Sequence, residues 1–326
     1  MAMFELKPTV EHVIWGAFDA RIPPVLTVRS GDTVVIETVS GAADVLPPSG
    51  MGVEVSPKLL AIHAHTPRRG VHILTGPVAI EGAEPGDMLE VRIDSIELAS
   101  DWGYAGFRPL MGALPEDFPE THIAHLRIDR ARSVCATPWG QELPLAPFFG
   151  VMGVAPKPAY GPINTREPRE HGGNLDNKEL TAGSRLFLPV WTKGANFSVG
   201  DGHGVQGDGE VCVMALETAL RGAFTFILHK RGDQAKPLLT FPRAETETHY
   251  ISMGLNEDLD FAMKQALREM IAFIVARSSL SANEAYILCS LAADFHVTQT
   301  VNGEKGVHGL LRKDRLPRRA RGNAID

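Results

Sequence analysis

Three stretches of the chain repeat one pattern, in which a glycine turn is followed by apolar residues at every second position. They are residues 24–40, 76–98 and 180–202, with turns around Gly31, Gly86 and Gly183. In the second stretch, Leu89, Val91 and Ile93 alternate with charged residues. Turn residues next to period-two alternation predict half-buried antiparallel strands. Many short strands with frequent turns favour a sandwich or a barrel.

The last third of the chain has helical periodicity instead. Residues 256–277 carry apolar side chains at helical spacing, with Asn256 as the expected N-cap and acidic residues in the first turn. Residues 281–295 begin with Ser281 and Glu284, which have the spacing of a capping box. The fold class that follows is mainly β with an α+β portion. It has an antiparallel β-sandwich-like core, with a C-terminal helical pair packed on a sheet.

The expected organisation is a β-rich region over residues 1–255 and a C-terminal helical portion with a basic tail over residues 256–326, joined in one globular unit. Within the first region, residues 101–175 are rich in proline and glycine. Long loops in a compact domain are commonly functional. We therefore expect residues 101–175 to form long ordered loops that shape a pocket.

Charge and cysteine content limit the partners that the protein could bind and the cell compartment in which it could lie. The chain has 326 residues and a net charge of −7, which disfavours binding to nucleic acids. The basic tail at 312–322 is interpreted as a solvated terminus or a subunit-contact arm. Three widely spaced cysteines indicate neither a disulfide framework nor a metal-binding pair. No signal peptide and no apolar run of about 18 residues is seen. We expect a cytoplasmic protein that binds no membrane.

Residues 197–211, FSVGDGHGVQGDGEV, hold five glycines, three acids and one histidine. Three of the glycines have the GxGxxG spacing of dinucleotide-binding loops. The acids would repel a pyrophosphate, however, and Asp208-Gly209 interrupts the helix that such a loop requires. Val205 stands where a calcium-binding EF-hand loop needs an oxygen ligand. Two interpretations remain: a structural glycine turn, or a site where the backbone closely approaches a small ligand.

The second interpretation makes Asp201 and His203 candidate ligands of a divalent metal such as zinc, because a carboxylate and an imidazole suit that ion. A metal site needs further ligands from other segments. Candidates there are Asn174, Asp176, His63, His65, His72, Glu81 and Glu84. His63 and His65 have the HxH spacing of many metal-binding strands.

Four segments make the chain similar to the acetamidase/formamidase family, which includes hydrolases that open γ-lactams. They are LTGPVAIEGAEPGDMLEVRI, HGGNLDNKELTAGSRLFLPV, GANFSVGDGHGVQGDGEVCVMALE and, more loosely, LAADFHVTQTVNGEKGVHGLL. The resemblance implies a cytoplasmic homo-oligomeric hydrolase that converts a small aliphatic amide to ammonia and a carboxylate. It also implies a β-sandwich-like core with an added α+β portion.

Amide hydrolysis needs an activated water, stabilisation of the oxyanion and a proton for the leaving nitrogen. A bound metal lowers the pKa of water from about 16 towards 7, a carboxylate carries the proton, and backbone amides stabilise the oxyanion. The expected metal ligands are Asp176, Asp201, His203 and His72; the expected proton carriers are Glu210 and Glu84; the expected substrate-binding residues are Gly202, Gly204 and Asn174. The competing hypothesis is a non-catalytic β-sandwich module that binds a metal or a small ligand.

Overall fold

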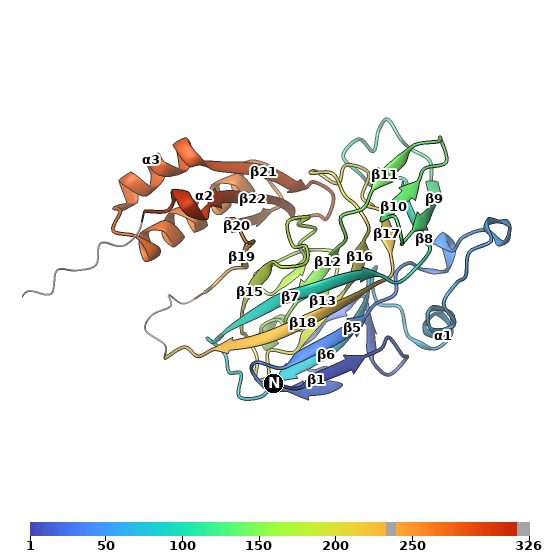
Figure 1. Ribbon diagram of the computed structural model, residues 1–326, viewed down its shortest axis with the longest axis horizontal. Helices are drawn as coiled ribbons and strands as arrows, with labels where there is room; N and C mark the ends of the chain where they lie inside the picture. Colours follow the sequence, from blue (N-terminus) through green and yellow to red (C-terminus); the bar gives the residue numbers. More distant parts are fainter. Residues whose placement is uncertain (233–238, 318–326) are drawn as a thin grey trace, which may run out of the picture.

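Two large sheets make up most of the protein. The structure is a computed structural model that describes residues 1–232 and 239–317 (Figure 1). The first sheet has nine strands in the order β1-β5-β18-β7-β15-β19-β20-β22-β21. These strands are β1 (Met3–Leu6), β5 (Thr33–Glu37), β18 (Leu220–His229), β7 (Met88–Leu98), β15 (Arg185–Pro189), β19 (Arg243–Glu245), β20 (His249–Asn256), β22 (Lys305–Arg312) and β21 (Ala293–Gln299).

The second sheet has eleven strands and carries the polar cluster described below. Its main path runs β11-β10-β9-β8-β17-β16-β12-β14, and β6 joins it by pairing with β16, β2 and β4. The strands are β11 (Glu142–Pro144), β10 (Val134–Ala136), β9 (His122–Asp129), β8 (Trp102–Phe107), β17 (Glu217–Thr218), β16 (Phe197–His203), β12 (Phe148–Gly153), β14 (Gly172–Asn174), β6 (Ile73–Ile80), β2 (Val13–Trp15) and β4 (Leu26–Val28). A separate pair joins β3 (Ala17–Phe18) to β13 (Ile163–Asn164).

The main core lies between the two sheets and confirms the predicted alternation. Val91 and Ile93 of β7 are fully buried, and so are Phe197 and Val199 of β16. All four belong to one apolar cluster that draws on both sheets. Most strand pairs are antiparallel, with β1–β5 and β4–β6 as parallel pairs. The mainly β, sandwich-like architecture expected from the sequence is therefore confirmed.

Three α-helices accompany the sheets: α1 (Pro57–His65), α2 (Leu259–Arg277) and α3 (Ala282–Ala292). The predicted capping box of α3 is confirmed, since Ser281 and Glu284 bond each other's backbone. The N-cap of α2 is Asp258, whose side chain accepts a hydrogen bond from the Phe261 amide. The expectation that Asn256 is the cap is wrong, because the chain is still in β20 at that residue.

The segment after α3 forms the strands β21 and β22, which the helical pattern did not predict. Both extend the first sheet beyond β20. Helix α2 packs on β20 and β22, so the predicted helical pair does lie against a sheet, at one end of the molecule (Figure 1). No helix among the described residues is both long and apolar enough to cross a membrane. The basic tail lies outside the described residues from 318 onward.

Residues 101–175 combine short strands with the expected loops, which still make up more than half of the segment. They contain the strands β8 to β14 together with a short 3₁₀ helix at Pro158–Tyr160, and residues 108–121 and 154–162 are the longest segments without strand. Further 3₁₀ turns lie at Ala43–Val45, Ser49–Met51 and Lys313–Arg315. The strand β12, FFGVMG, contains two glycines and was missed for that reason. It is fully buried between β14 and β16, where packing outweighs the low strand propensity of glycine.

Candidate active site

Four carboxylates and one imidazole gather in the middle of the second sheet. Asp201 and His203 lie on β16, Glu217 begins β17, Asp176 follows β14, and Glu210 lies in the loop after β16. None of the five is more than 8% exposed. Because charged side chains are almost never fully buried without a partner, a cluster of this kind marks a specialised site.

Strand register explains why these residues meet. Asp201 and His203 are two residues apart on one strand, so their side chains share a face. His203 is opposite Glu217 in the β16–β17 pair. On the other side, the Asp176 amide donates to the carbonyl of Gly150 on β12, at 3.1 Å, which holds Asp176 beside the same face. Sheet pairing thus brings three separate segments to one point.

Gly150 forms the floor of the cluster. A Cβ at this position would lie 2.5 Å from Asp176 Oδ1, 2.7 Å from Asp201 Oδ2 and 2.8 Å from His203 Cε1. These separations are far below van der Waals contact. The absence of a side chain at Gly150 is therefore what gives the three polar groups room to converge.

His203 is at the centre of the cluster. Its Nε2 lies 3.2 Å from Asp201 Oδ2, 3.3 Å from Glu217 Oε1 and 3.9 Å from Asp176 Oδ1. Two sets of possible ligand atoms share this imidazole, with all atoms of each set within 4.8 Å of one another. The sets are Asp176 with His203 and Glu210, and Asp201 with His203 and Glu217.

Gln206 fixes which nitrogen of His203 faces the acids. Gln206 Nε2 donates to the Asp176 carbonyl at 2.8 Å, so its Oε1 is the atom 3.0 Å from His203 Nδ1. That oxygen can only accept, and His203 Nδ1 must therefore carry a proton. Nε2 is left to face the carboxylates, as in metal sites where the second ring nitrogen is held by a hydrogen bond.

Several buried polar atoms of the cluster have no hydrogen-bond partner among the described residues. They are Asp176 Oδ1, His203 Nε2, Glu210 Oε2, Glu217 Oε2 and, close by, Asn174 Oδ1. Buried polar atoms are nearly always paired, and leaving one unpaired costs about 1–3 kcal/mol. Acidic atoms left without a hydrogen bond around one shared imidazole fit a divalent cation bound by either set of possible ligand atoms.

Burial and mutual repulsion shift the titration of the acids. Burial, reinforced by the negative charge of Asp201, raises the pKa of Glu217 to about 8. Burial and the charge of Asp176 raise the pKa of Glu210 well above its usual range. For Asp201 burial acts in the same direction, but His72 and His203 outweigh it and the pKa falls. Opposite shifts in neighbouring carboxyls allow one to hold a proton while another stays ionised.

Three of these acids also have left-handed backbone conformations. Their φ angles are 46° at Asp176, 57° at Asp201 and 43° at Glu210. Non-glycine residues rarely adopt positive φ, and such conformations cost of order 1–3 kcal/mol each. Strained backbone at three residues of one cluster indicates that the direction of their carboxylates matters for function.

The cluster faces a cavity of about 200 Å³. Asp176, Asp201, Glu210 and Glu217 line it, with His203 beneath them. Two of the predicted site residues, His72 and Asn174, line it as well. His72 Nε2 lies 3.7 Å from Asp201 Oδ2, outside both sets of possible ligand atoms. Asn174 Nδ2 donates to the Arg166 carbonyl at 3.2 Å, so its unpaired Oδ1 is the atom that remains available.

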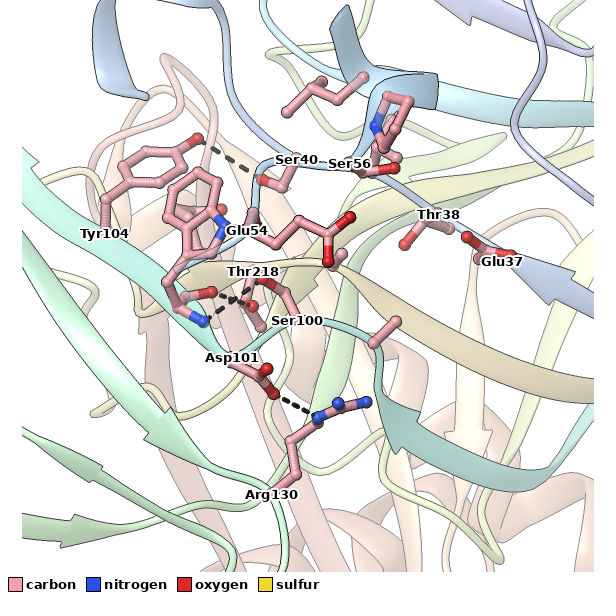
Figure 2. A pocket seen from close by; sticks show the side chains of 17 residues that line it. Glu37, Thr38, Ser40, Glu54, Ser56, Ser100, Asp101, Tyr104, Arg130 and Thr218 are labelled. Atoms are coloured by element: carbon pink, nitrogen blue, oxygen red, sulfur yellow. Dashed lines mark hydrogen bonds and ion pairs between the residues drawn. The ribbon is translucent and has the colours of Figure 1, made fainter. Parts of the chain in front are cut away.

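A second cavity of about 240 Å³ shares Glu217 and Tyr104 with the first (Figure 2). Figure 2 marks interactions for some of its polar side chains, such as Ser40 with Tyr104, and none for Glu54 and Ser56. Asp101 and Arg130 form an ion pair at 2.6 Å, and Thr218 Oγ1 donates to the Trp102 carbonyl at 2.8 Å.

The structure does not bring Glu84 to the cluster. Strand β6 runs antiparallel to β16, with Leu74 opposite Gly200 and Val78 opposite Phe197. Glu84 is exposed, follows the end of β6 beyond Val78, and is not among the residues that line the cavity. The structure therefore does not bring it together with Glu210.

Gly202 and Gly204 line neither the cavity nor the cluster, which corrects their assignment to substrate binding. A Cβ on Gly202 would collide with Leu220 and the Thr218 carbonyl, and one on Gly204 with Leu216. The Gly204 amide already donates to the Leu216 carbonyl at 2.7 Å. These glycines allow close packing inside the sheet.

One other expectation needs correction. His63 and His65 lie on helix α1, where His63 Nε2 is 3.0 Å from the Gly41 carbonyl, so they are not on a metal-binding strand. Residues 211–216 form a loop that contributes Val213 and Met214 to the cavity wall, although alternating apolar residues of this kind suggest a strand. Sequence reasoning missed Glu217, Gly150, Gln206 and Asn302. Asn302 Nδ2 donates to Asp176 Oδ2, across more than a hundred residues of sequence.

A β-rich fold with a buried acid–imidazole cluster facing a small cavity defines a protein with a small-molecule site of the kind that binds divalent cations. The chain belongs to the acetamidase/formamidase family, since the sequence model of that family matches residues 7–167 and 157–307.

Proteins similar to this chain are found both by sequence and by structure. A formamidase from Methylophilus methylotrophus is 33% identical over 192 residues, which cover 43% of this chain and 47% of the relative. An acetamidase from Mycolicibacterium smegmatis is 31% identical over 43% of this chain and 49% of the relative. These matches thus span about half the length of each curated relative. The crystal structure of an acetamidase from Bacillus halodurans is 33% identical, covers 94% of this chain and 97% of its own, and superposes with a TM-score of 0.81.

Proposed function

We propose that this protein hydrolyses the C–N bond of a small amide, giving a carboxylate and ammonia, or an amino acid from a γ-lactam. The observation that carries the proposal is the buried cluster of unpaired acid and imidazole atoms facing a cavity of about 200 Å³. Membership of the acetamidase/formamidase family and the names of the similar proteins support this chemistry.

The residues present fit a divalent metal, and we propose zinc. We propose Asp176, Asp201 and His203 as its ligands. The two sets of possible ligand atoms join His203 to Asp176 and Glu210, and to Asp201 and Glu217. Gly150 leaves the space for these side chains. Carboxylate and imidazole donors are those that zinc accepts in catalytic sites. When bound, such an ion polarises a carbonyl group and makes water acidic enough to attack near neutral pH.

Glu210 is the proposed proton carrier. It lines the cavity, and its Oε2 has no partner among the described residues. Burial and the charge of Asp176 raise its pKa, which favours the protonated form that a proton donor needs. In the reaction, the water oxygen bonds to the carbonyl carbon and the C–N bond breaks. Glu210 delivers a proton to the leaving nitrogen and regains one from the water.

The neighbouring polar groups orient this chemistry. Gln206 holds the His203 ring through Nδ1, and Asn302 holds one oxygen of Asp176. Each of these contacts leaves the opposite atom, His203 Nε2 or Asp176 Oδ1, directed into the cluster. Residues in this position commonly contribute 10- to 100-fold to metal affinity or activity, as an order-of-magnitude estimate.

Ammonia release from formamide, acetamide and a γ-lactam tests the proposal. We expect turnover of at least one linear amide, and a loss of about 100-fold or more in the Glu210→Gln variant, which preserves volume. Glu84→Gln is the matched control, because Glu84 is exposed and remote, and should keep normal turnover. A protein that binds metal but releases no ammonia from any of the amides would instead be the non-catalytic binding module.

We further propose a homo-oligomer in the cytoplasm. Tyr286, Ile287 and Leu291 on α3 are 59%, 60% and 79% exposed, an apolar surface that a second subunit could cover. All three cysteines are free, as is usual in a reducing compartment. Light scattering coupled to size exclusion tests the assembly, and a monomeric mass would contradict it.

A further inference from the structure

Three arginines line the same cavity as the acid cluster: Arg68, Arg108 and Arg166. A small neutral amide such as formamide has no charge for them to recognise. The arginines therefore require an explanation beyond hydrolysis of the simplest amides.

Arg68 and Arg166 have no acidic partner among the described residues. Arg68 Nε donates to the Gly70 carbonyl at 3.2 Å, and an Arg166 terminal nitrogen to the Val301 carbonyl at 3.5 Å. Arg166 Nε is buried without any described partner. By contrast, Arg108 is paired with Asp44 at 2.7 Å. A guanidinium carries five N–H donors, so both arginines have further donors for a ligand. Arg166 is half-buried, while Arg68 is exposed and its guanidinium lies over the Trp15 ring, 5.6 Å from the centroid.

The cavity also has room and an apolar lining between its charged ends. Val71, Val213 and Met214 contribute apolar surface to it. Its volume of about 200 Å³ exceeds the roughly 150 Å³ that suffices for benzene, a ligand of six heavy atoms. A substrate longer than acetamide, with a short carbon chain, would fill this space.

We propose that the preferred substrate carries a carboxylate at the end opposite its amide, as in a monoamide of a short dicarboxylic acid, and that Arg166 and Arg68 bind that carboxylate. This inference rests on the proposed amidase function. Guanidinium groups match carboxylates with paired, charge-assisted hydrogen bonds. They would also offset the repulsion of an anionic substrate by the acid cluster, so the amide end can reach it.

Paired substrates test the inference. Succinamate has one amide and one carboxylate, and succinamide is the neutral molecule of nearly the same shape. We expect the unmodified protein to hydrolyse succinamate with a kcat/KM about 10- to 100-fold higher per amide group, the range for hydrogen bonds to charged groups. Equal or better turnover of succinamide would overturn the inference.

Arg166→Gln and Arg68→Gln should each remove most of that preference, chiefly through KM for succinamate, while acetamide turnover stays within about threefold. Arg169→Gln is the matched control. Arg169 lies three residues from Arg166, is not among the residues that line the cavity, and pairs with Glu304 at 3.3 Å. A preference that survives both cavity variants, or is lost equally in the control, contradicts the assignment.

Binding of succinate, measured by calorimetry, separates the two proposals. Acetamide turnover reports on the amidase function, and the change in succinate binding on substitution of Arg166 reports on the arginines. We expect succinate to bind, and to bind at least about 10-fold more weakly to the Arg166→Gln variant. If no amide is hydrolysed, the amidase proposal fails whatever succinate does. If acetamide is hydrolysed but succinate does not bind, only the carboxylate assignment fails.

Discussion

The two cavities on either side of Tyr104 and Glu217 are similar in size but differ in how their polar groups are satisfied. The inner one, about 200 Å³, is lined by acids with unpaired buried atoms. The outer one, about 240 Å³, has polar groups held in pairs, such as Asp101 with Arg130 (Figure 2). Glu37 there is likewise paired with Lys58, at 2.6 Å.

This difference indicates which of the two cavities binds a ligand. Paired polar groups lower the energy of the folded protein by themselves, whereas unpaired buried ones raise it unless a ligand is bound. The inner cavity therefore carries the larger cost, since of the four acids only Glu217 also lines the outer cavity. If this is so, substitutions in the inner cavity should affect activity far more than substitutions in the outer cavity.

The largest effect should follow from removing the shared imidazole. His203→Gln should lower kcat/KM by about 1,000-fold or more, because both sets of possible ligand atoms contain His203. Arg130→Gln in the outer cavity is the control, and we expect activity within about twofold of normal. Amide hydrolysis rates measure both. Comparable losses in the two variants would remove the distinction between the cavities.

Filling the floor of the inner cavity should have the next largest effect. In Gly150→Ala the new methyl group would contact Asp176, Asp201 and His203 at under 3 Å, displacing them. A shift of about 1 Å at a catalytic group can cost about 100-fold in rate, which is the loss we expect.

Gly207→Ala is the matched control for this substitution, because nothing lies within 4 Å of a Cβ at Gly207. It should keep normal activity. Circular dichroism and thermal unfolding would show that both variants are folded. Full activity in Gly150→Ala would show that the convergence of the three side chains is not needed for the reaction.

The smallest effect on activity is expected at His171, a buried residue that does not line either cavity. Neither of its ring nitrogens has a partner among the described residues, and burial lowers its pKa from 6.5 to about 4. Between these values the unfolded chain binds a proton that the folded chain does not, so stability falls as the pH falls. Between pH 7 and pH 4.5 this residue alone should remove about 2 kcal/mol from the free energy of unfolding.

Urea unfolding at pH 7 and pH 4.5 would measure this loss. In the His171→Leu variant the loss between the two pH values should be smaller, while amidase activity at pH 7 stays near normal. An unchanged pH dependence of stability would contradict the role given to His171. A large loss of activity would show that unpaired buried groups mark function even outside the cavities.

The parts of the fold that could be predicted are those that depend on neighbouring residues. The alternation of Leu89, Val91 and Ile93 and the capping box at Ser281 are local patterns, and both are present. Strands β21 and β22 were missed because they are set by pairing with each other and with β20. The apolar residues 211–216 do not form the strand they suggest, because they turn over the cavity instead.

The site shows the same limit. Asp176, Asp201, His203 and Glu210 could be selected from their residue types and the glycines around them, and the structure places all four in one cluster. Glu217 could not, because only its register opposite His203 gives it a place there. The place of Gly150 in the site likewise depends on strand pairing and could not be predicted. Gly202 and Gly204 looked like substrate-binding residues, but the space where each lacks a side chain is filled by packed neighbours.

Measuring the metal content tests directly whether the acid–imidazole cluster binds a divalent ion that the reaction needs. The protein as purified, dialysed exhaustively against metal-free buffer, would be analysed by inductively coupled plasma mass spectrometry together with amide hydrolysis. We predict about one divalent ion per chain, zinc above all, a fall to background in Asp201→Asn, and activity that follows metal content across the samples. Full amidase activity in a protein with far less than one metal ion per chain would contradict the account.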